Sequence, residues 1–418
     1  MTNSKTTLIL NKAHHIELSN HDRKKNIFIN GMPSTGVSTF VSELIFQDIN
    51  NGLKTVLLDP YGYLSTKILS RMSKEQLDDT VYIDIGNTDY PVGLNLFNVT
   101  SDEEKRGVAN AVIELMYSLY DSNRTGIIGP RFDHAVRNAV QAVLYDGKSS
   151  FIELVRCFTD ISYVNQIIPK ISDPALRSYW TKQIASTSDF HKSETMDYIV
   201  SKFGRFVTDP KIRNIVNQFD ASFDFSSLMA EKKVIIIDFS KFLNDYDAMK
   251  ILSEIILSKI NQYIKTIGDE DALSLYVDEI DIFSNRKLTE LLRFGSLFNL
   301  NLSITTQRAS SLQADLLNEL LRVGTLIAFR LSRADAMILA PEFHKNISVD
   351  HLCLLNKFHM VIKTLKSGNP VIYEDINNEN SDYDVKDSKD IEMIKLEKTK
   401  VYGRPVSLVE DDIKSRLV

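Results

Sequence analysis

The residues from Gly31 to Thr39 (GMPSTGVST) have the spacing of a loop that binds phosphate. They follow an apolar run, Asn26–Asn30 (NIFIN), and precede a stretch with helical periodicity. Gly31 and Gly36 let the backbone curl so that its N–H groups face a phosphate, and the following helix adds its positive end. The hydroxyl of Ser38 would then contact Mg²⁺. The residues predicted to bind ATP are Gly31, Thr35, Gly36, Val37, Ser38 and Thr39.

One position of this loop departs from the phosphate-binding pattern. The pattern has a lysine between Gly36 and Ser38, where this chain has Val37. A hydrogen bond to a charged group is worth about 1.5–3 kcal/mol in a ground state, and more where transition-state charge is stabilised. Lys24 and Lys25 precede the predicted strand, roughly 16 Å from the loop at about 3.3 Å per residue. Two alternatives stay open. A lysine from the helical region or from a neighbouring subunit would take the place of the missing one, or the segment Gly31–Ser38 is an ordinary turn between a strand and a helix.

Two acids end another apolar run, Leu273–Val277 (LSLYV). In an ATPase with such a loop, Asp278 would hold Mg²⁺ through its water shell. Glu279 would then polarise the attacking water as the catalytic base. The alternative is that Asp278 and Glu279 only cap the helix that follows.

Two further polar residues stand at later strands. Leu302–Thr306 is followed by Gln307, which is predicted to sense the γ-phosphate by hydrogen bonding; otherwise it is a polar strand end. Arg330 is expected inside a strand over Thr325–Leu331, where an arginine is costly unless it meets an anion. We predict that Arg330 contacts the nucleotide of a neighbouring subunit as an arginine finger. A salt bridge with Asp335 or another acid is the alternative.

The elements around these motifs alternate between short β-type runs and helical stretches. This alternation predicts an α/β fold with a mostly parallel central sheet. From about residue 101 to residue 217 the periodicity is helical throughout, which predicts an inserted all-α domain. Asp375–Asp390 is polar and is expected to be mobile. The predicted boundaries are an N-terminal extension at 1–25, a core at 26–100 and 218–373, the insertion at 101–217, and an acidic linker and C-terminal tail at 374–418.

Composition narrows the possible classes of protein. The chain has 418 residues, 43% of them hydrophobic, and a formal charge of −6. Seven acids and two lysines between Glu374 and Asp390 account for −5 of that charge, so a local basic channel elsewhere remains possible. No run reaches the ~18 apolar residues of a membrane span, and the start lacks the pattern of a signal peptide. With two cysteines and no cluster of metal-binding spacing, the chain is expected to be cytoplasmic.

Taken in order, these motifs resemble the HerA/FtsK class of P-loop ATPases and are especially similar to TraG/TraD-type coupling proteins of conjugation and type IV secretion. The resemblance covers about residues 26 to 373. Besides the motifs above it rests on Leu58-Asp59-Pro60-Tyr61-Gly62, Leu94-Asn95-Leu96-Phe97, Gly129-Pro130-Arg131, Lys202-Phe203, Asp209-Pro210, Gly324-Thr325, Phe329-Arg330 and Asp335-Ala336.

The resemblance implies a RecA-like ATPase that pumps DNA through a hexameric ring with ATP and Mg²⁺. Val37 and Tyr61 stand where the family has lysines, and neither a membrane anchor nor an N-terminal barrel is evident. Two functions therefore stay open. One is a working DNA translocase, as a homo-hexamer. The other is a catalytically degenerate module that holds nucleotide or DNA, or joins a hetero-oligomer with an active paralogue, without efficient hydrolysis. A scaffold that binds neither ligand is a third, weaker possibility.

Overall fold

The structure, a computed structural model, describes residues 7–99, 102–183, 189–219, 223–266, 272–283, 285–343, 346–366, 368–378 and 388–417. The chain divides into two compact units, each built from three segments. The first unit comprises Met1–Ile85, Phe225–Met249 and Ile260–Lys398. The second comprises Gly86–Asp224, Lys250–Lys259 and Thr399–Val418. The domain boundaries expected from the sequence stay predictions.

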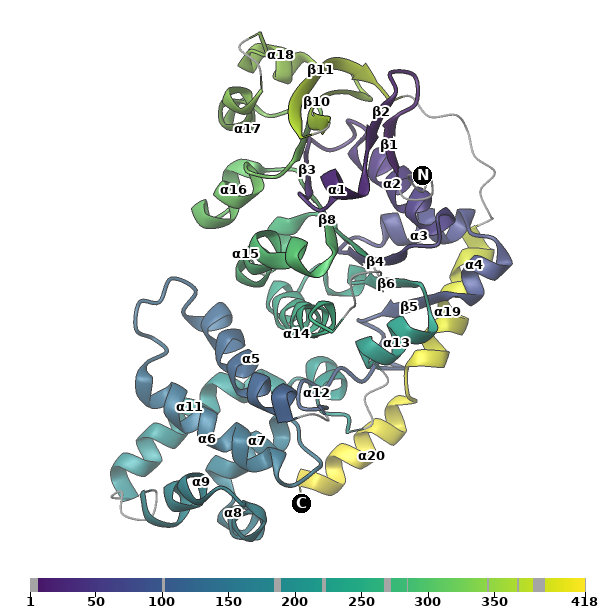
Figure 1. The fold of residues 1–418 in the computed structure, drawn as a ribbon. Coiled ribbons are helices and arrows are strands. Elements are labelled where there is room, and N and C mark those ends of the chain that lie inside the picture. Colours follow the sequence, from purple (N-terminus) through teal and green to yellow (C-terminus); the bar gives the residue numbers. More distant parts are fainter. Residues whose placement is uncertain are drawn as a thin grey trace. The chain divides into compact units, whose positions relative to one another are not determined.

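Within the described residues, the first unit contains a nine-stranded sheet with the order β11-β10-β9-β3-β8-β7-β4-β6-β5 (Figure 1). All neighbouring strands from β9 to β5 pair in parallel, whereas β10 pairs antiparallel with both β9 and β11. The predicted α/β class with a mostly parallel sheet is therefore confirmed. The strands are β3 (Ile27–Asn30), β4 (Lys54–Asp59), β5 (Thr80–Asp84), β6 (Val234–Asp238), β7 (Leu273–Val277), β8 (Leu300–Thr306), β9 (Thr325–Ala328), β10 (His359–Lys366) and β11 (Asn369–Asn377).

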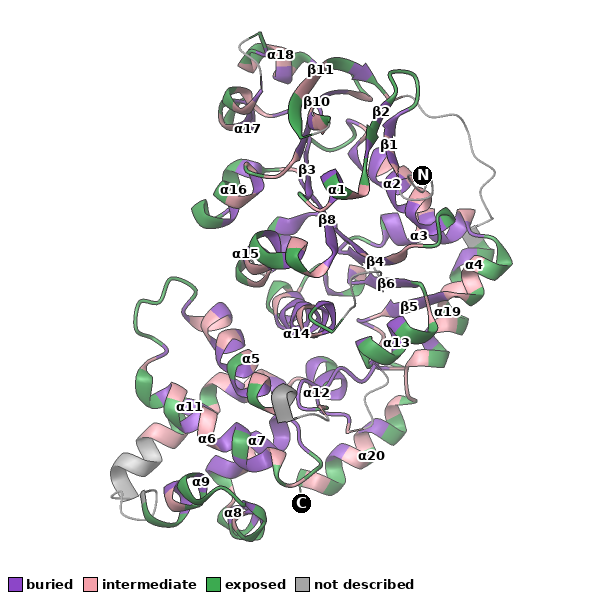
Figure 2. Cartoon of the chain, in the orientation of Figure 1, coloured by how far each residue is buried: buried purple, intermediate pink, exposed green. Residues whose placement is uncertain are grey.

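The central strands are buried at nearly every position, because both faces of the sheet are covered (Figure 2). On one face, Ile29 of β3 and Tyr276 of β7 share a hydrophobic cluster with helices α2 (Val37–Asn50) and α3 (Tyr63–Arg71). A short antiparallel pair, β1 (Leu8–Asn11) and β2 (Ile16–Leu18), joins the same cluster.

The remaining helices of the first unit flank the sheet or connect its strands. They are α1 (Asn20–Arg23), α4 (Lys74–Asp78), α13 (Phe225–Glu231), α15 (Asn285–Phe294), α16 (Ala314–Leu320), α17 (Arg333–Leu339) and α18 (Val349–Leu354). Two long helices, α14 (Tyr246–Ile264) and α19 (Ser388–Tyr402), contribute residues to both units.

A buried ion pair ties three of these elements together. The guanidinium of Arg23, the last residue of α1, donates to both carboxylate oxygens of Asp48 in α2, one of them at 2.8 Å. The hydroxyl of Tyr276 in β7 donates to the same carboxylate at 2.7 Å. Both charged side chains are buried, so the pair fixes α2 against the sheet.

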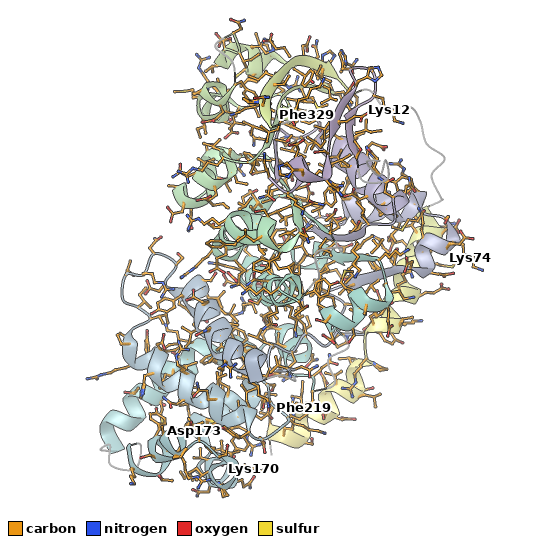
Figure 3. The ribbon with its side chains drawn as sticks, viewed as in Figure 1. Lys12, Lys74, Lys170, Asp173, Phe219 and Phe329 are labelled. Carbon is orange, nitrogen blue, oxygen red and sulfur yellow. The ribbon has the colours of Figure 1, made fainter. Side chains whose placement is uncertain are left out.

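Every described element between Asp102 and Val216 in the second unit is helical. An aromatic group that includes Phe151, Phe203 and Phe206 forms part of its core. Arg416 of the last helix lies against Phe219, which Figure 3 labels, and ion-pairs with buried Glu153. The helices are α5 (Asp102–Tyr120), α6 (Pro130–Leu144), α7 (Phe151–Thr159), α8 (Ile161–Ile167), α9 (Pro174–Ser178), α11 (Asp189–Thr208), α12 (Pro210–Val216) and α20 (Val406–Leu417).

Two expectations about local structure were wrong. Strand β9 ends at Ala328 rather than Leu331, because the chain turns there and the Arg330 carbonyl accepts a hydrogen bond from Met32. Strand β11 continues to Asn377, so the start of the segment expected to be mobile pairs with β10, and Ile376 is buried. The segment's end, from Ser388, is helical, and residues 379–387 lie outside the described part. No helix in the described ranges is long and apolar enough to cross a membrane.

Candidate nucleotide site

The loop after β3 is fastened to the strands on both sides of it. The Gly31 N–H donates to the Thr306 carbonyl at the end of β8, at 3.3 Å. The Met32 N–H donates to the Arg330 carbonyl, just beyond β9, at 2.9 Å. Within the loop, the Thr35 hydroxyl donates to the Met32 carbonyl at 2.7 Å. These bonds hold the loop at the carboxyl edge of the sheet, where α/β proteins bind their ligands.

The loop's curl depends on two residues with left-handed backbone angles. Gly36 has a φ of 119°, and a Cβ placed there would lie 2.7 Å from Cδ1 of Phe358. Ser34 has a φ of 65°, which is uncommon for a residue other than glycine. The Phe358 N–H donates to the Thr35 carbonyl at 2.7 Å, so the segment before β10 braces the loop.

The N-terminus of α2 presents unpaired backbone donors. Its first intrahelical bond runs from the Phe40 N–H to the Gly36 carbonyl. The N–H groups of Val37, Ser38 and Thr39 have no acceptor in the part of the chain that the structure describes. Three converging N–H groups at the positive end of a 14-residue helix suit a phosphate group. On this observation the loop fits the phosphates of ATP.

The side chain of Val37 does not face these donors. It is 9% exposed and belongs to the hydrophobic cluster beneath the sheet, together with Phe40 and Phe329. The Val37 side chain fills the space next to Gly31, because a Cβ placed at Gly31 would lie 2.6 Å from Val37 Cγ2. Phe329, labelled in Figure 3, packs edge-on against Phe40 with ring centroids 5.8 Å apart. Val37 thus serves as a core residue of the loop.

Asp278 and Glu279 follow β7 at the same edge, and the end of β8 binds both. The Thr305 hydroxyl donates to Asp278 Oδ1 at 2.6 Å and accepts the Glu279 N–H at 2.8 Å. Because β8 lies between β3 and β7, its last residues contact the loop on one side and the two acids on the other. Glu279 itself has a φ of 49°, a strained conformation that is typical of functional sites.

The two acids are buried, and burial dominates their protonation. Burial raises the pKa of Asp278 to about 7, although the hydrogen bond from Thr305 lowers it. Burial, followed by the charge of Asp278, raises the pKa of Glu279 to about 8. A nearby cation, such as a magnesium ion, would reverse these shifts.

Gln307 lies directly against Glu279. Its side-chain amide donates to Oε1 at 2.7 Å, and its backbone N–H donates to Oε2 at 3.0 Å. Neighbouring Thr306 donates to Asp281 at 3.1 Å. Gln307 therefore binds Glu279 and is more than a polar residue at the end of a strand.

Arg330 lies beside the loop of its own chain, through its carbonyl bond to Met32. Its side chain makes no ion pair with Asp335 within the described residues. The Asp335 carboxylate instead accepts hydrogen bonds from Ser310 and Ser332. The salt bridge considered from the sequence is therefore absent from this part of the chain, and the Arg330 guanidinium is left for another anion.

Asp59, the last residue of β4, binds the backbone that follows it. Asp59 accepts hydrogen bonds from the N–H groups of Tyr61, Gly62 and Ser65, at 3.1, 2.9 and 2.7 Å, which caps the start of α3. Burial and the charge of Asp238 raise the pKa of Asp59. Tyr61, in contrast, is exposed near the acids, and its pKa is raised by burial and by the charge of Glu279.

Sequence reasoning missed one cation at this site. Lys67 of α3 donates to the Thr39 hydroxyl at 3.2 Å, next to the N-terminus of α2. Nothing in the local sequence marks Lys67, since only the packing of α3 against α2 brings it to the loop.

Several solved structures share this fold. The plasmid coupling protein TrwB in complex with the non-hydrolysable ATP analogue ADPNP matches with a TM-score of 0.66 at 14% identity, over 91% of both chains. TrwB with ADP and Mg²⁺ matches with a TM-score of 0.65 at 15% identity, over the same shares. VirB4 of Thermoanaerobacter pseudethanolicus matches with a TM-score of 0.62 at 12% identity, over 90% of this chain and 98% of that one.

At these identities the likeness shows the fold, which is the RecA-like fold of TrwB and VirB4. The resemblance to coupling proteins that the motifs indicated is confirmed at the level of the fold. The sequence matches no protein-family profile and no curated protein sequence.

Proposed function

We propose that this chain binds Mg-ATP at the carboxyl edge of the first unit's sheet and hydrolyses it to move DNA. The observation that carries the proposal is the position of the end of β8. Its carbonyl at Thr306 accepts from Gly31 of the loop, while Thr305 and Gln307 hold Asp278 and Glu279. One strand end thereby sets the distance between a phosphate cradle and a pair of buried acids.

Each residue then has a defined task. The loop from Gly31 to Thr39, including the hydroxyl-bearing Thr35, would hold the phosphate chain through backbone N–H groups. Ser38 and Asp278 would hold Mg²⁺, which neutralises charge on the phosphates when bound.

Hydrolysis requires a base beside that cradle. Glu279 would take the proton of the attacking water in its ionised form, and Gln307 fixes its orientation through two hydrogen bonds. Arg330 has no carboxylate partner among the described residues and would stabilise negative charge on a nucleotide of an adjoining subunit. This role requires an oligomer, either a homo-hexamer or a hetero-oligomer with an active paralogue.

A basic pocket supports the DNA part of the proposal. A cavity of about 740 Å³ lies at the opposite edge of the sheet, near the residues that precede β3 and β9. Its wall includes the partly exposed ring of Phe294, a suitable surface for stacking a base. The charged residues that line it are Lys24, Lys25, Arg293, Arg322 and Lys363, with Glu319 as the acid.

Val37 favours a second candidate function. Because its side chain is packed in the core, no ammonium projects from this position toward the phosphates. The chain would then be a binding module that holds nucleotide or DNA, or joins a ring with an active paralogue, without turning over itself.

Phosphate release by the purified chain, with and without DNA, separates the two candidates. A working motor releases phosphate faster with DNA than without, and the Glu279→Gln variant does not. Release that stays at the level of Glu279→Gln under both conditions would reject hydrolysis. Binding of ATP or DNA in that case would leave the binding module as the function.

A further inference from the structure

Helices α2 and α3 lie side by side and run in the same direction, with matched residues facing each other. Lys67 of α3 contacts Thr39 of α2, and one turn further Arg71 contacts Glu43. The two residues of each pair lie 28 positions apart in the sequence, so the second contact repeats the first one turn further along both helices. Lys67 is therefore the cation of α3 that lies nearest to the phosphate loop, one turn closer than Arg71.

The ammonium of Lys67 contacts a hydroxyl and forms no ion pair among the residues that the structure describes. The closest acid on the facing helix, Glu43, is bound by Arg71. Partial burial lowers the pKa of Lys67, with the Glu43 charge raising it and Arg71 lowering it again. A cation in this position gains most from an anion that arrives from outside the chain.

The site for such an anion adjoins Lys67. Thr39 carries both the hydroxyl that Lys67 contacts and one of the three unpaired N–H groups at the start of α2. A phosphate held by the Thr39 N–H is thus a near neighbour of the ammonium. We propose that Lys67 supplies, from α3, the phosphate-binding cation that Val37 does not supply from α2.

This inference rests on the proposed nucleotide site and assigns Lys67 a part in it. The cation approaches from the side of Thr39, whereas a lysine at position 37 would extend from the start of the helix. Lys67 accordingly strengthens the binding of the phosphate chain as a whole. Because the residue is 28 positions from the loop, the sequence pattern around Gly36 does not reveal it.

Another lysine near the loop provides a matched control. Lys357 precedes Phe358, whose ring packs against Gly36, and its ammonium lies 4.8 Å from the centre of that ring. Lys357 is exposed and precedes β10, which lies on the other side of β3 from β4, the strand before α3. If any lysine near the loop serves equally well, Lys357→Met and Lys67→Met will have the same effect.

The test measures equilibrium binding of ATP to the full chain in the presence of Mg²⁺, for example by calorimetry. Loss of a charged hydrogen bond predicts that Lys67→Met binds ATP roughly 10- to 100-fold more weakly. Lys67→Arg should retain most of the affinity, and Lys357→Met should bind like the unaltered chain. Inorganic tripolyphosphate, used as a competitor, should lose affinity for Lys67→Met by the same factor, since the contact is to phosphate.

A second-site variant distinguishes phosphate binding from a structural role of Lys67. Val37→Lys, introduced into Lys67→Met, should restore ATP affinity by returning an ammonium to the loop. Unchanged ATP affinity of a folded Lys67→Met chain would overturn the inference, as would an equal loss in Lys357→Met. If Lys67→Met does not fold, a Lys67→Gln variant gives the same comparison. An unaltered chain that binds no ATP overturns both the inference and the nucleotide site, whereas ATP binding without hydrolysis contradicts the proposed motor alone.

Discussion

Gln307 occupies both carboxylate oxygens of Glu279, one through its side-chain amide at 2.7 Å and the other through its backbone N–H at 3.0 Å. A carboxylate held in this way has a fixed orientation, and a change at the end of β8 reaches it directly. Because Thr306 also accepts from Gly31 of the loop, β8 links the candidate base to the phosphate cradle.

The side-chain half of this contact can be removed without the backbone half. In a hydrolysing chain, Gln307→Ala leaves Glu279 free to rotate, so we expect turnover to fall by roughly 10- to 100-fold, the scale of a mispositioned general base. ATP affinity should change little, since Gln307 contacts the acid. Steady-state kinetics would check this as a fall in kcat with KM nearly constant. A Gln307→Ala chain with weakened ATP binding and normal kcat would contradict the assignment.

The raised pKa of Glu279 makes stability depend on pH in the absence of metal. Its pKa is about 8 in the folded chain and near 4.5 when unfolded, so the folded state binds more protons between these values. Glu279 alone should therefore lower stability as pH rises from about 4.5 toward 8, by up to about 1.4 kcal/mol per pH unit, and Asp278, whose pKa is raised to about 7, adds to the fall below pH 7. Urea unfolding with a chelator, followed by circular dichroism at several pH values, measures this. Glu279→Gln should flatten the dependence, and an unchanged slope would show that another group is responsible.

Some of this site follows from the sequence because its signals are local. The glycine spacing of the loop and the apolar strand before Asp278 both depend on neighbouring residues. Each was predicted at or within a few residues of its observed position. Arg330 fell outside its predicted strand because a backbone bond to Met32, far away in sequence, turns the chain after Ala328.

The rest of the site depends on which strands and helices become neighbours. The bond between Gln307 and Glu279 exists because β8 lies next to β7, and the contact of Lys67 with Thr39 exists because α3 packs on α2. Asp48 illustrates the same limit within the core. A polar residue in an amphipathic helix is ordinarily solvated, yet Arg23 and Tyr276 bury it completely.

The Arg23–Asp48 pair should be costly to break from one side. Asp48→Ala leaves the Arg23 guanidinium buried without its carboxylate, and we expect a loss of about 3–5 kcal/mol in the free energy of unfolding. Tyr276→Phe removes one hydrogen bond to the same carboxylate and should cost about 1–3 kcal/mol. Urea unfolding of both variants gives the comparison. Replacing both charges, as Arg23→Met with Asp48→Leu, should cost less than Asp48→Ala alone, and a larger loss would contradict this account.

The basic pocket provides the sharpest test of a DNA partner. Lys25 forms no ion pair in the described part of the chain, and Arg322 is 3.7 Å from a glutamate that already binds Arg293. If both contact DNA phosphates, Lys25→Gln with Arg322→Gln should weaken DNA binding. It should also reduce the dependence of log affinity on log salt by about 0.9 for each lost contact to duplex DNA. Fluorescence anisotropy over a series of salt concentrations measures both effects.

A matched pair of surface lysines controls for the loss of net charge in that experiment. Lys12 and Lys74, both exposed and labelled in Figure 3, belong to the same unit but lie outside the pocket. Lys12→Gln with Lys74→Gln removes the same charge and should leave the salt slope unchanged, because released counterions report specific phosphate contacts. Equal slopes for the two double variants would mean that the pocket does not bind the DNA backbone, and the DNA-contacting surface would then lie elsewhere in the chain.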